Sequence, residues 1–206
     1  MTTEELIAAM AADRRRHRPP RWGPVVMAAL VSAALFGLFW SPRPDLATAL
    51  AGALLVKTAF PLALAATALA LAFRLARPAA WAPVRPALAL AGLAALGLLA
   101  GAITLQPTAV RAEAWSEARL ALCLVSIPAL GALPMATAFH QLRRGASSDP
   151  ARTGLCAGLA AGGIGAMLYS LACSDDSPLF FVPAYGAAII GMGELGQILG
   201  RRCLGI

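Results

Sequence analysis

The chain has 206 residues, of which 59% are hydrophobic and only 13% charged, and its mean hydropathy is +0.72. A soluble domain of this length is far less apolar, so the composition excludes that class and predicts an integral membrane protein. Aromatic residues make up only 6%, and the apolar excess consists of Ala, Leu and Gly, which suit close helix packing in lipid. We therefore predict an all-α, polytopic membrane protein.

The formal net charge of +7 comes from arginine clusters that flank apolar runs and have no interleaved aromatic residues. This arrangement is typical of charges at a membrane boundary, so we expect no direct contact with nucleic acid. Residues 1–13 are polar and acidic, and the first apolar run follows an arginine cluster, which is not the order of a cleavable signal peptide.

A membrane-spanning helix needs about 20 mostly apolar residues. Six segments meet this requirement: 24–40, 47–73, 86–105, 118–139, 153–172 and 178–199. The chain is thus divided into an N-terminal segment at 1–23, a six-helix bundle at 24–200 and a tail at 201–206. The short loops leave no room for a second soluble domain.

Six spans would put both chain ends on one side of the membrane. Thirteen arginines fall on that side and three on the other, while the single lysine lies inside the second span. Because basic residues in short loops stay on the cytoplasmic side, we predict that both termini are cytoplasmic.

The four cysteines fall into two pairs on this topology. Cys123, about one turn into the fourth span, and Cys173, at the end of the fifth, lie at nearly the same height on the outer side. Cys156 and Cys203 lie on the inner side. Only the outer pair faces a compartment in which a disulfide persists. Two alternatives stay open: buried packing residues, or a functional or bridged pair, which requires Cα atoms within about 7 Å.

Two adjacent carboxylates follow Cys173 in the sequence CSDDSP. Asp175 and Asp176 are explained as turn residues, with Ser177 or Asp176 capping the sixth helix and Pro178 in its first turn. Alternatively, a thiolate with carboxylates is a mixed site for a soft or borderline metal such as zinc or cadmium. No histidine lies nearby to strengthen the second interpretation.

Lys57 and Glu194 lie well inside the predicted spans, where charges usually pair or carry a function. Lys57 is about ten residues into the second span, and Glu194 lies in the last third of the sixth. We expect Lys57 toward the middle of the membrane and Glu194 nearer the inner face, so that their pairing depends on the helix register. Glu194 with Gln197 is equally explained as the polar cytoplasmic end of its helix.

The N-terminal segment contains the candidate for a contact with a soluble partner. Leu6, Ile7 and Met10 form one apolar stripe of a short helix, with Thr3 as its cap and acidic residues in its first turn. A helix of this length is marginal in water, so it requires a surface to order against. The acidic face disfavours lipid and favours the groove of another protein.

Nothing in the sequence indicates catalysis. There is no histidine cluster, no Ser–His pairing, no Cys-x-x-Cys motif and no phosphate-binding loop. We predict that the protein is not an enzyme and has no cofactor, apart from transient binding of a heavy metal. An alternative is a small transporter or metal-efflux component that uses Lys57 and Glu194, with the acidic outer loop as its mouth.

Several stretches together resemble the NrsF-type membrane anti-sigma factors. They are TEELIAAMAAD, PRPDL after the first span, Lys57, Cys123, LRRGA after the fourth span, and CSDDSPLFFVPAYG with the final GRR. The resemblance covers nearly the whole chain, and its specific parts are the last outer loop and the paired outer cysteines. The chain departs from the family's pattern after PLF, where it has Pro183 and a single Tyr185 in place of an aromatic pair.

The resemblance implies a six-helix protein of the bacterial inner membrane that holds an extracytoplasmic-function (ECF) sigma factor inactive at its cytoplasmic face. It further implies that Cys123 and Cys173 sense an envelope stress such as a heavy metal. The apolar stripe of Leu6, Ile7 and Met10 is then the candidate contact with the sigma factor.

Overall fold

The computed structural model describes residues 2–16, 20–46, 53–77, 83, 84, 87, 90–95 and 117–204, and within them every regular element is a helix. The helices are α1 (Thr3–Arg16), α2 (Gly23–Phe39), α4 (Ala53–Leu75), α7 (Glu117–Leu142), α8 (Pro150–Ser170) and α9 (Pro178–Cys203). The predicted all-α class is therefore confirmed for this part of the chain.

Four of these helices, α4, α7, α8 and α9, are long and apolar enough to cross a membrane. α2 has 17 residues and is equally apolar but shorter than the other four. These five correspond to five of the predicted spans, with ends within a few residues wherever the structure describes them. The predicted span 86–105 lies almost wholly outside the described residues.

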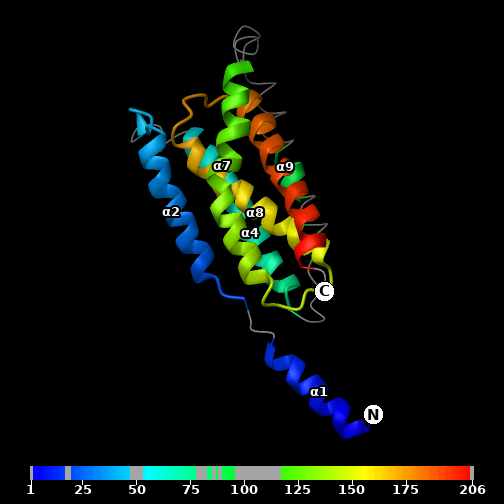
Figure 1. Cartoon of the computed structure of the whole chain (residues 1–206). Coiled ribbons are helices and arrows are strands. Elements are labelled where there is room, and N and C mark those ends of the chain that lie inside the picture. Colours follow the sequence, from blue (N-terminus) through cyan, green and yellow to red (C-terminus); the bar gives the residue numbers. More distant parts are fainter. Residues whose placement is uncertain are drawn as a thin grey trace.

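α8 occupies the centre of the bundle, as Figure 1 shows. It packs against α9, α4 and α7, while α2 packs on the outside of α7. Of its most apolar window, 83% is buried inside the protein, against 39–50% for the other three long helices. A bilayer supplies no hydrophobic force between helices, so this burial depends on close van der Waals contact.

Glycines bring the backbones of α8 and α9 together. A side chain at Gly158 would collide with the Met192 carbonyl, and one at Gly196 with the Gly154 carbonyl. Such small-residue contacts are the usual means by which membrane helices approach closely. We call this contact the glycine seam, defined by Gly154 and Gly158 on α8 and by Gly193, Gly196 and Gly200 on α9.

α1 lies apart from the bundle, near the end that carries the C-terminus (Figure 1). Its N-terminus has a capping box, in which the Thr2 hydroxyl accepts a hydrogen bond from the Glu5 amide and the Glu5 carboxylate accepts one from the Thr2 amide. The prediction that Thr3 is the cap was wrong by one residue, because the glutamate three positions after Thr2 completes the box.

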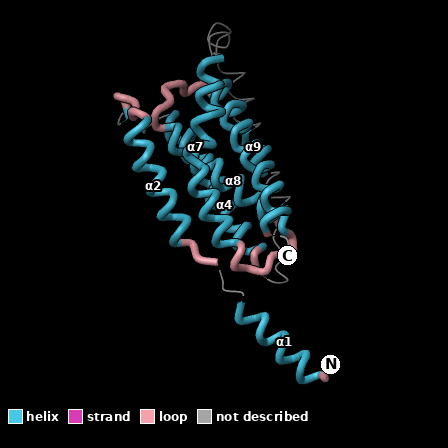
Figure 2. Tube along the Cα trace, viewed as in Figure 1, coloured by secondary structure: helices cyan, strands magenta, loops and turns pink. Residues whose placement is uncertain are grey.

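Figure 2 shows that the described loops lie at the two ends of the bundle. One end holds the turn between α7 and α8 together with the C-terminus. The opposite end, which we call the outer end, holds residues 40–46 after α2, the start of α7 and residues 171–177 between α8 and α9. The polar residues singled out in the sequence gather at this outer end.

Candidate functional site

Cys123 and Cys173 lie next to each other at the outer end of the bundle. Cys123 is fully buried in the second turn of α7, and Cys173 is partly buried three residues after the end of α8. Their thiols are within hydrogen-bonding reach of one another, and both cysteines are free. Two helix ends that are distant in sequence thus form a dithiol, which we call the thiol site.

Two tyrosines surround the thiols. The Tyr169 hydroxyl, on α8, lies close to Cys123, and the Tyr185 hydroxyl, on α9, lies close to Cys173. The rings of Tyr169 and Tyr185 meet edge to face, with their centroids 6.1 Å apart. Tyr185 is 3% exposed, and within the described structure its hydroxyl has no hydrogen bond of ordinary geometry. A buried polar group without a full partner is costly, so the thiol site is not a purely apolar packing contact.

Lys57 reaches the thiol site from α4. Its side chain is 0% exposed, and its ammonium nitrogen lies 2.7 Å from the Cys173 carbonyl oxygen and 2.6 Å from that of Asp175. It lies 3.4 Å from the Asp176 carboxylate and 5.8 Å from the centroid of the Tyr185 ring. The charge therefore sits directly beneath the loop that carries Cys173.

Arg43 holds the same loop from the other side. Its side chain is 6% exposed and makes a bidentate contact to Asp176, at 2.8 and 2.9 Å, and another to Asp45, at 2.7 and 2.8 Å. These hydrogen bonds raise the pKa of the Arg43 guanidinium and lower that of the Asp45 carboxyl. The Arg43 amide also donates to the Leu171 carbonyl, which ties residues 40–46 to the end of α8.

Asp175 is also engaged. One of its carboxylate oxygens accepts from the exposed Arg119 guanidinium at 3.0 Å, and the other accepts from the Ser177 amide at 3.2 Å. With the contacts to Lys57 and Arg43, the loop is held by groups from α4, from α7 and from the chain after α2. The structure thus places three cations and three carboxylates around one dithiol: Arg43, Lys57, Arg119, Asp45, Asp175 and Asp176.

The environment favours the ionised form of Cys173. The hydrogen bond from the Cys123 thiol is the main reason that the pKa of Cys173 falls to about 5, although burial opposes this effect. The Lys57 charge and the Asp175 amide lower the pKa further. A thiol with such a pKa is a thiolate at neutral pH, which is the form that reacts with oxidants, electrophiles and soft metal ions.

Two expectations from the sequence require correction. Of the two caps predicted for α9, Ser177 occupies the N-cap position with Pro178 after it, without a side-chain cap bond, whereas the Asp176 carboxylate contacts Arg43 and Lys57 instead. Lys57 does not lie toward the middle of the membrane, because the 173–176 loop folds over its ammonium at the outer end. Lys57 pairs with Asp176, and no ion pair joins it to Glu194 among the described residues.

The carboxylates next to Cys173 are engaged in ion pairs and hydrogen bonds. Asp175 and Asp176 are committed to Arg119, Lys57, Arg43 and the Ser177 amide. In the part of the chain that the structure describes, no group of three or more His, Cys, Asp or Glu is arranged to hold a metal ion. The site as built offers two sulfurs, which are sufficient for a disulfide or for two-coordinate capture of a soft cation.

Comparison with known families identifies the chain. A family model described as NrsF, negative regulator of sigma F, matches residues 7–205, which is nearly the full length. The chain belongs to this family. Searches among curated proteins and among solved structures find no match to it. As an NrsF-family protein, the chain is a negative regulator of a sigma factor.

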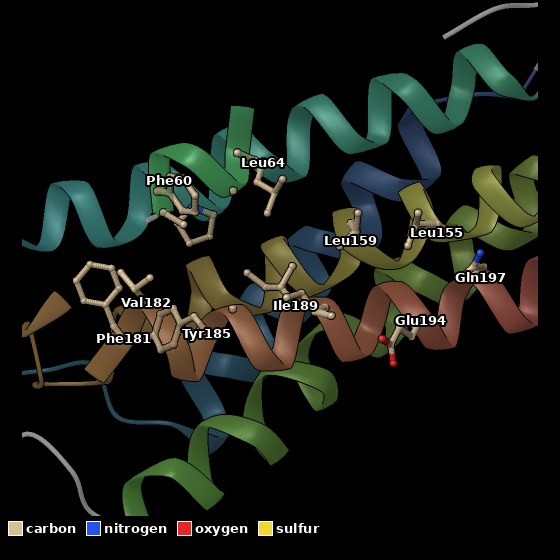
Figure 3. Close-up of a pocket in the computed structure, with 16 residues that line it drawn as sticks. Phe60, Leu64, Leu155, Leu159, Phe181, Val182, Tyr185, Ile189, Glu194 and Gln197 are labelled. Carbon is tan, nitrogen blue, oxygen red and sulfur yellow. The ribbon is translucent and has the colours of Figure 1, made fainter. Parts of the chain in front are cut away.

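The NrsF-family chain also has an apolar cavity of about 470 Å³ between α4, α8, α9 and residues 91–95. Figure 3 shows Phe60, Phe181 and Tyr185 toward one end of it and Glu194 and Gln197 toward the other. Tyr185 thus contributes its ring to the cavity wall while its hydroxyl faces Cys173. Glu194, at the other end of the cavity, is exposed.

The apolar stripe on α1 has no partner in the described structure. Leu6 is 45% exposed and Ile7 61%, while the side chain of Met10 lies outside the described residues.

The inner cysteines are placed differently from the outer pair. Cys156 is buried in α8, and Cys203 is partly buried at the end of α9.

Sequence reasoning missed Arg43, Arg119, Tyr169 and the site role of Tyr185. Arg43 is one of the three arginines that the sequence places on the outer side, and its position in PRPDL near Asp45 is a local signal of an ion pair. Its contact with Asp176 spans 133 residues and depends on helix packing. Tyr169 stands four residues before Cys173, which is about one helical turn, and this spacing was the available signal.

Proposed function

We propose that the protein is a six-span regulator of the bacterial inner membrane with both termini in the cytoplasm. At its cytoplasmic face it sequesters a sigma factor of the ECF class, and it releases this partner when a redox or heavy-metal signal reacts with Cys123 and Cys173. Membership of the NrsF family supplies the negative regulation of a sigma factor. The single observation that carries the sensing step is the free dithiol of a buried Cys123 and a partly buried Cys173, beside a buried lysine.

The two functions are assigned to opposite ends of the molecule. The thiol site lies at the outer end, and α1 with its exposed Leu6 and Ile7 lies beyond the other end (Figure 1). The excess of arginines at that other end supports its cytoplasmic location, and hence the periplasmic location of the thiols. A periplasmic dithiol is exposed to oxidants and to soft metal ions before these reach the cytoplasm.

The sensing step can be either of two reactions at the Cys123 and Cys173 sulfurs. A two-electron oxidant such as hydrogen peroxide joins the two sulfurs: the Cys173 thiolate and the Cys123 thiol together give up two electrons and one proton, and hydrogen peroxide with that proton is reduced to water and hydroxide. A soft metal ion instead displaces the thiol proton and binds both sulfurs. Either reaction draws Cys173 toward Cys123, and so pulls on a loop that is bonded to Lys57 and Arg43.

The cytoplasmic partner is expected to bind the apolar stripe of α1. A short amphipathic helix with an acidic first turn is the form in which a peptide enters the groove of a folded protein. Release of most of the bound sigma factor requires several kcal/mol of coupling, since about 1.4 kcal/mol is only tenfold in affinity.

A reporter of the sigma factor's target genes tests the sensing step in cells. Changing Cys123→Ser together with Cys173→Ser should abolish the rise in expression that a peroxide or cadmium ion produces, while repression without the signal stays intact. Cys156→Ser is the matched control, because this cysteine is buried away from the thiol site. An unaltered response in the double variant would rule out the role of the thiols.

A pull-down with the detergent-solubilised full chain tests the cytoplasmic contact. Leu6→Asp with Ile7→Asp should lose the sigma factor that the wild-type chain captures. Ala8→Asp is the control, because helical geometry places Ala8 on the side of α1 opposite to the stripe. If the chain with Leu6→Asp and Ile7→Asp captures as much sigma factor as the Ala8→Asp chain, the assignment of α1 as the contact is contradicted.

A further inference from the structure

The loop that carries Cys173 depends on contacts from outside itself. Residues 173–177 have no regular secondary structure and connect α8 to α9. Within the loop, the Cys173 amide bonds back to Tyr169 and the Asp175 carboxylate accepts from the Ser177 amide. The carbonyls of Cys173 and Asp175 point instead to α4, where both accept hydrogen bonds from the Lys57 ammonium.

The Lys57 ammonium has as many hydrogen-bond donors as there are acceptor oxygens around it. An ammonium group has three hydrogens to donate and no acceptor, and Lys57 has three oxygens within reach: the carbonyls of Cys173 and Asp175 and one carboxylate oxygen of Asp176. The two carbonyl contacts are short, at 2.7 and 2.6 Å. The side chain therefore holds the backbone of the loop more tightly than it holds the carboxylate.

The burial of Lys57 makes these contacts obligatory. A fully buried charge is very costly unless it is paired and hydrogen-bonded. α4 presents no other ionisable side chain until Arg74 in its last turn, so the compensation comes from the loop. The carbonyls of the loop therefore supply the hydrogen bonds with which the buried charge is compensated.

Asp176 connects this contact to a second one. The same carboxylate that approaches Lys57 at 3.4 Å is held bidentately by Arg43. Arg43 in turn bonds through its amide to Leu171, two residues before Cys173. The position of the Cys173 sulfur is therefore fixed from both sides, by α4 through Lys57 and by the chain after α2 through Arg43.

We propose that Lys57 is the positioning residue of the thiol site: its ammonium clamps the backbone of residues 173–176 over α4, and this clamp holds the Cys173 sulfur against Cys123. The dithiol reacts as a pair only while the clamp is closed. The consequence for signalling rests on the proposed function, whereas the clamp itself is testable on the purified chain alone.

The test uses the full chain in nanodiscs, with Cys156→Ala and Cys203→Ser so that only the outer thiols react. Lys57→Met keeps the length of the side chain and removes its charge and its donors. Glu194→Gln is the matched control, because it removes the other ionisable group singled out in the spans at a place distant from the loop. Two quantities are measured: the rate at which hydrogen peroxide bridges Cys123 to Cys173, and the pH dependence of iodoacetamide labelling at Cys173, located by mass spectrometry.

Lys57→Met should slow the bridging about tenfold, a loss typical of removing hydrogen bonds to a charged group. The labelling rate at high pH should rise, because the freed loop exposes the sulfur. The pH midpoint of labelling should increase by about one unit or more, because an opposite charge nearby has been removed. A purely structural loss would change the amount of folded protein without moving this midpoint. Glu194→Gln should leave all three quantities unchanged.

Bridging by Lys57→Met at the wild-type rate overturns the proposal, whatever happens to the midpoint. If Lys57→Met is not recovered from the membrane, Asp176→Asn is measured instead. This variant keeps the two carbonyl contacts of Lys57 and weakens the third, so bridging should slow by a smaller factor. An unchanged rate of bridging in Asp176→Asn overturns the clamp. The proposed function fails separately, if peroxide bridges the wild-type thiols but target-gene expression does not respond.

Discussion

The glycine seam and the loop that carries Cys173 connect the same two helices, α8 and α9, in opposite ways. At the seam, glycines bring backbone against backbone, and a single added carbon at Gly158 meets the Met192 carbonyl. At the thiol site, the helices are joined by a loop that side chains from α4 and from the segment after α2 hold in place. The seam is held by direct backbone contact, whereas the loop is held by hydrogen bonds from side chains of other segments. Under the proposed function, a reaction at the thiols acts on the contact held by side chains and leaves the seam unchanged.

Enlarging a glycine of the seam should produce the largest effect. Gly158→Ala should destabilise the bundle by about 1–3 kcal/mol or more, because backbone atoms must shift to admit the methyl group. Thermal unfolding of the purified chain in detergent measures this loss. Gly191→Ala is the control: nothing lies within 4 Å of its added carbon, so it should be neutral or slightly stabilising. Equal effects at both positions would show that the seam is not closely packed.

Removing a charge that holds the loop should have an intermediate effect. Arg43→Gln leaves Asp176 with Lys57 alone and breaks the contact between residues 40–46 and the loop, at a cost of about 2 kcal/mol. Arg152→Gln removes an arginine whose pair with Asp149 is about half exposed, and it should cost less than about 1 kcal/mol. Chemical unfolding compares the two, and an equal loss would contradict the importance of burial at the outer end.

The ionisation of Cys173 predicts a pH dependence of its reactivity. Because its pKa is lowered to about 5, iodoacetamide labelling should be constant between pH 8 and 6 and fall about tenfold per unit below pH 5. The folded pKa lies below the ordinary thiol value of about 8.5. The thiolate therefore contributes stability above that value, and this contribution is lost as the pH falls through about 5. Labelling that rises only near pH 8.5 would contradict this environment.

The smallest effect is expected from the inner cysteine of α8. Cys156 is buried in the helix interior, away from Lys57 and both tyrosines. Cys156→Ala removes only a small side chain, so labelling of Cys173 and peroxide bridging should stay at the wild-type rate. A change in bridging comparable to that of Arg43→Gln would show that the outer thiols communicate with the middle of α8.

Much of the fold could be predicted from the sequence because the thickness of a bilayer fixes the length of a spanning helix. The apolar runs at 118–139, 153–172 and 178–199 agree with α7, α8 and α9 within a few residues. The same geometry places Cys123 and Cys173 at one height. For these features, distance along a helix translates directly into depth, and no knowledge of side-chain packing is needed.

The polar contacts could not be predicted in the same way. Lys57 was assigned to the middle of the membrane because its depth was counted along its own helix, whereas the loop folds over it from another part of the chain. The pair of Arg43 and Asp176 requires the end of α2 and the start of α9 to meet, which follows only from how α2, α7 and α8 pack. In the sequence, Asp176 looks like a helix cap, because aspartate is a common N-cap residue. The same residue type also forms ion pairs, and here Asp176 pairs with Arg43 and Lys57.

The central claim is that chemistry at the outer thiols weakens binding at the cytoplasmic end. Its most direct test is the affinity of the full chain in nanodiscs for the sigma factor captured in the pull-down, measured with Cys123 and Cys173 reduced and again after peroxide has bridged them. We predict that the bridged form binds at least about a hundredfold more weakly, equivalent to about 2.7 kcal/mol, and that reduction restores the affinity. Equal affinity of the reduced and bridged forms would contradict the account.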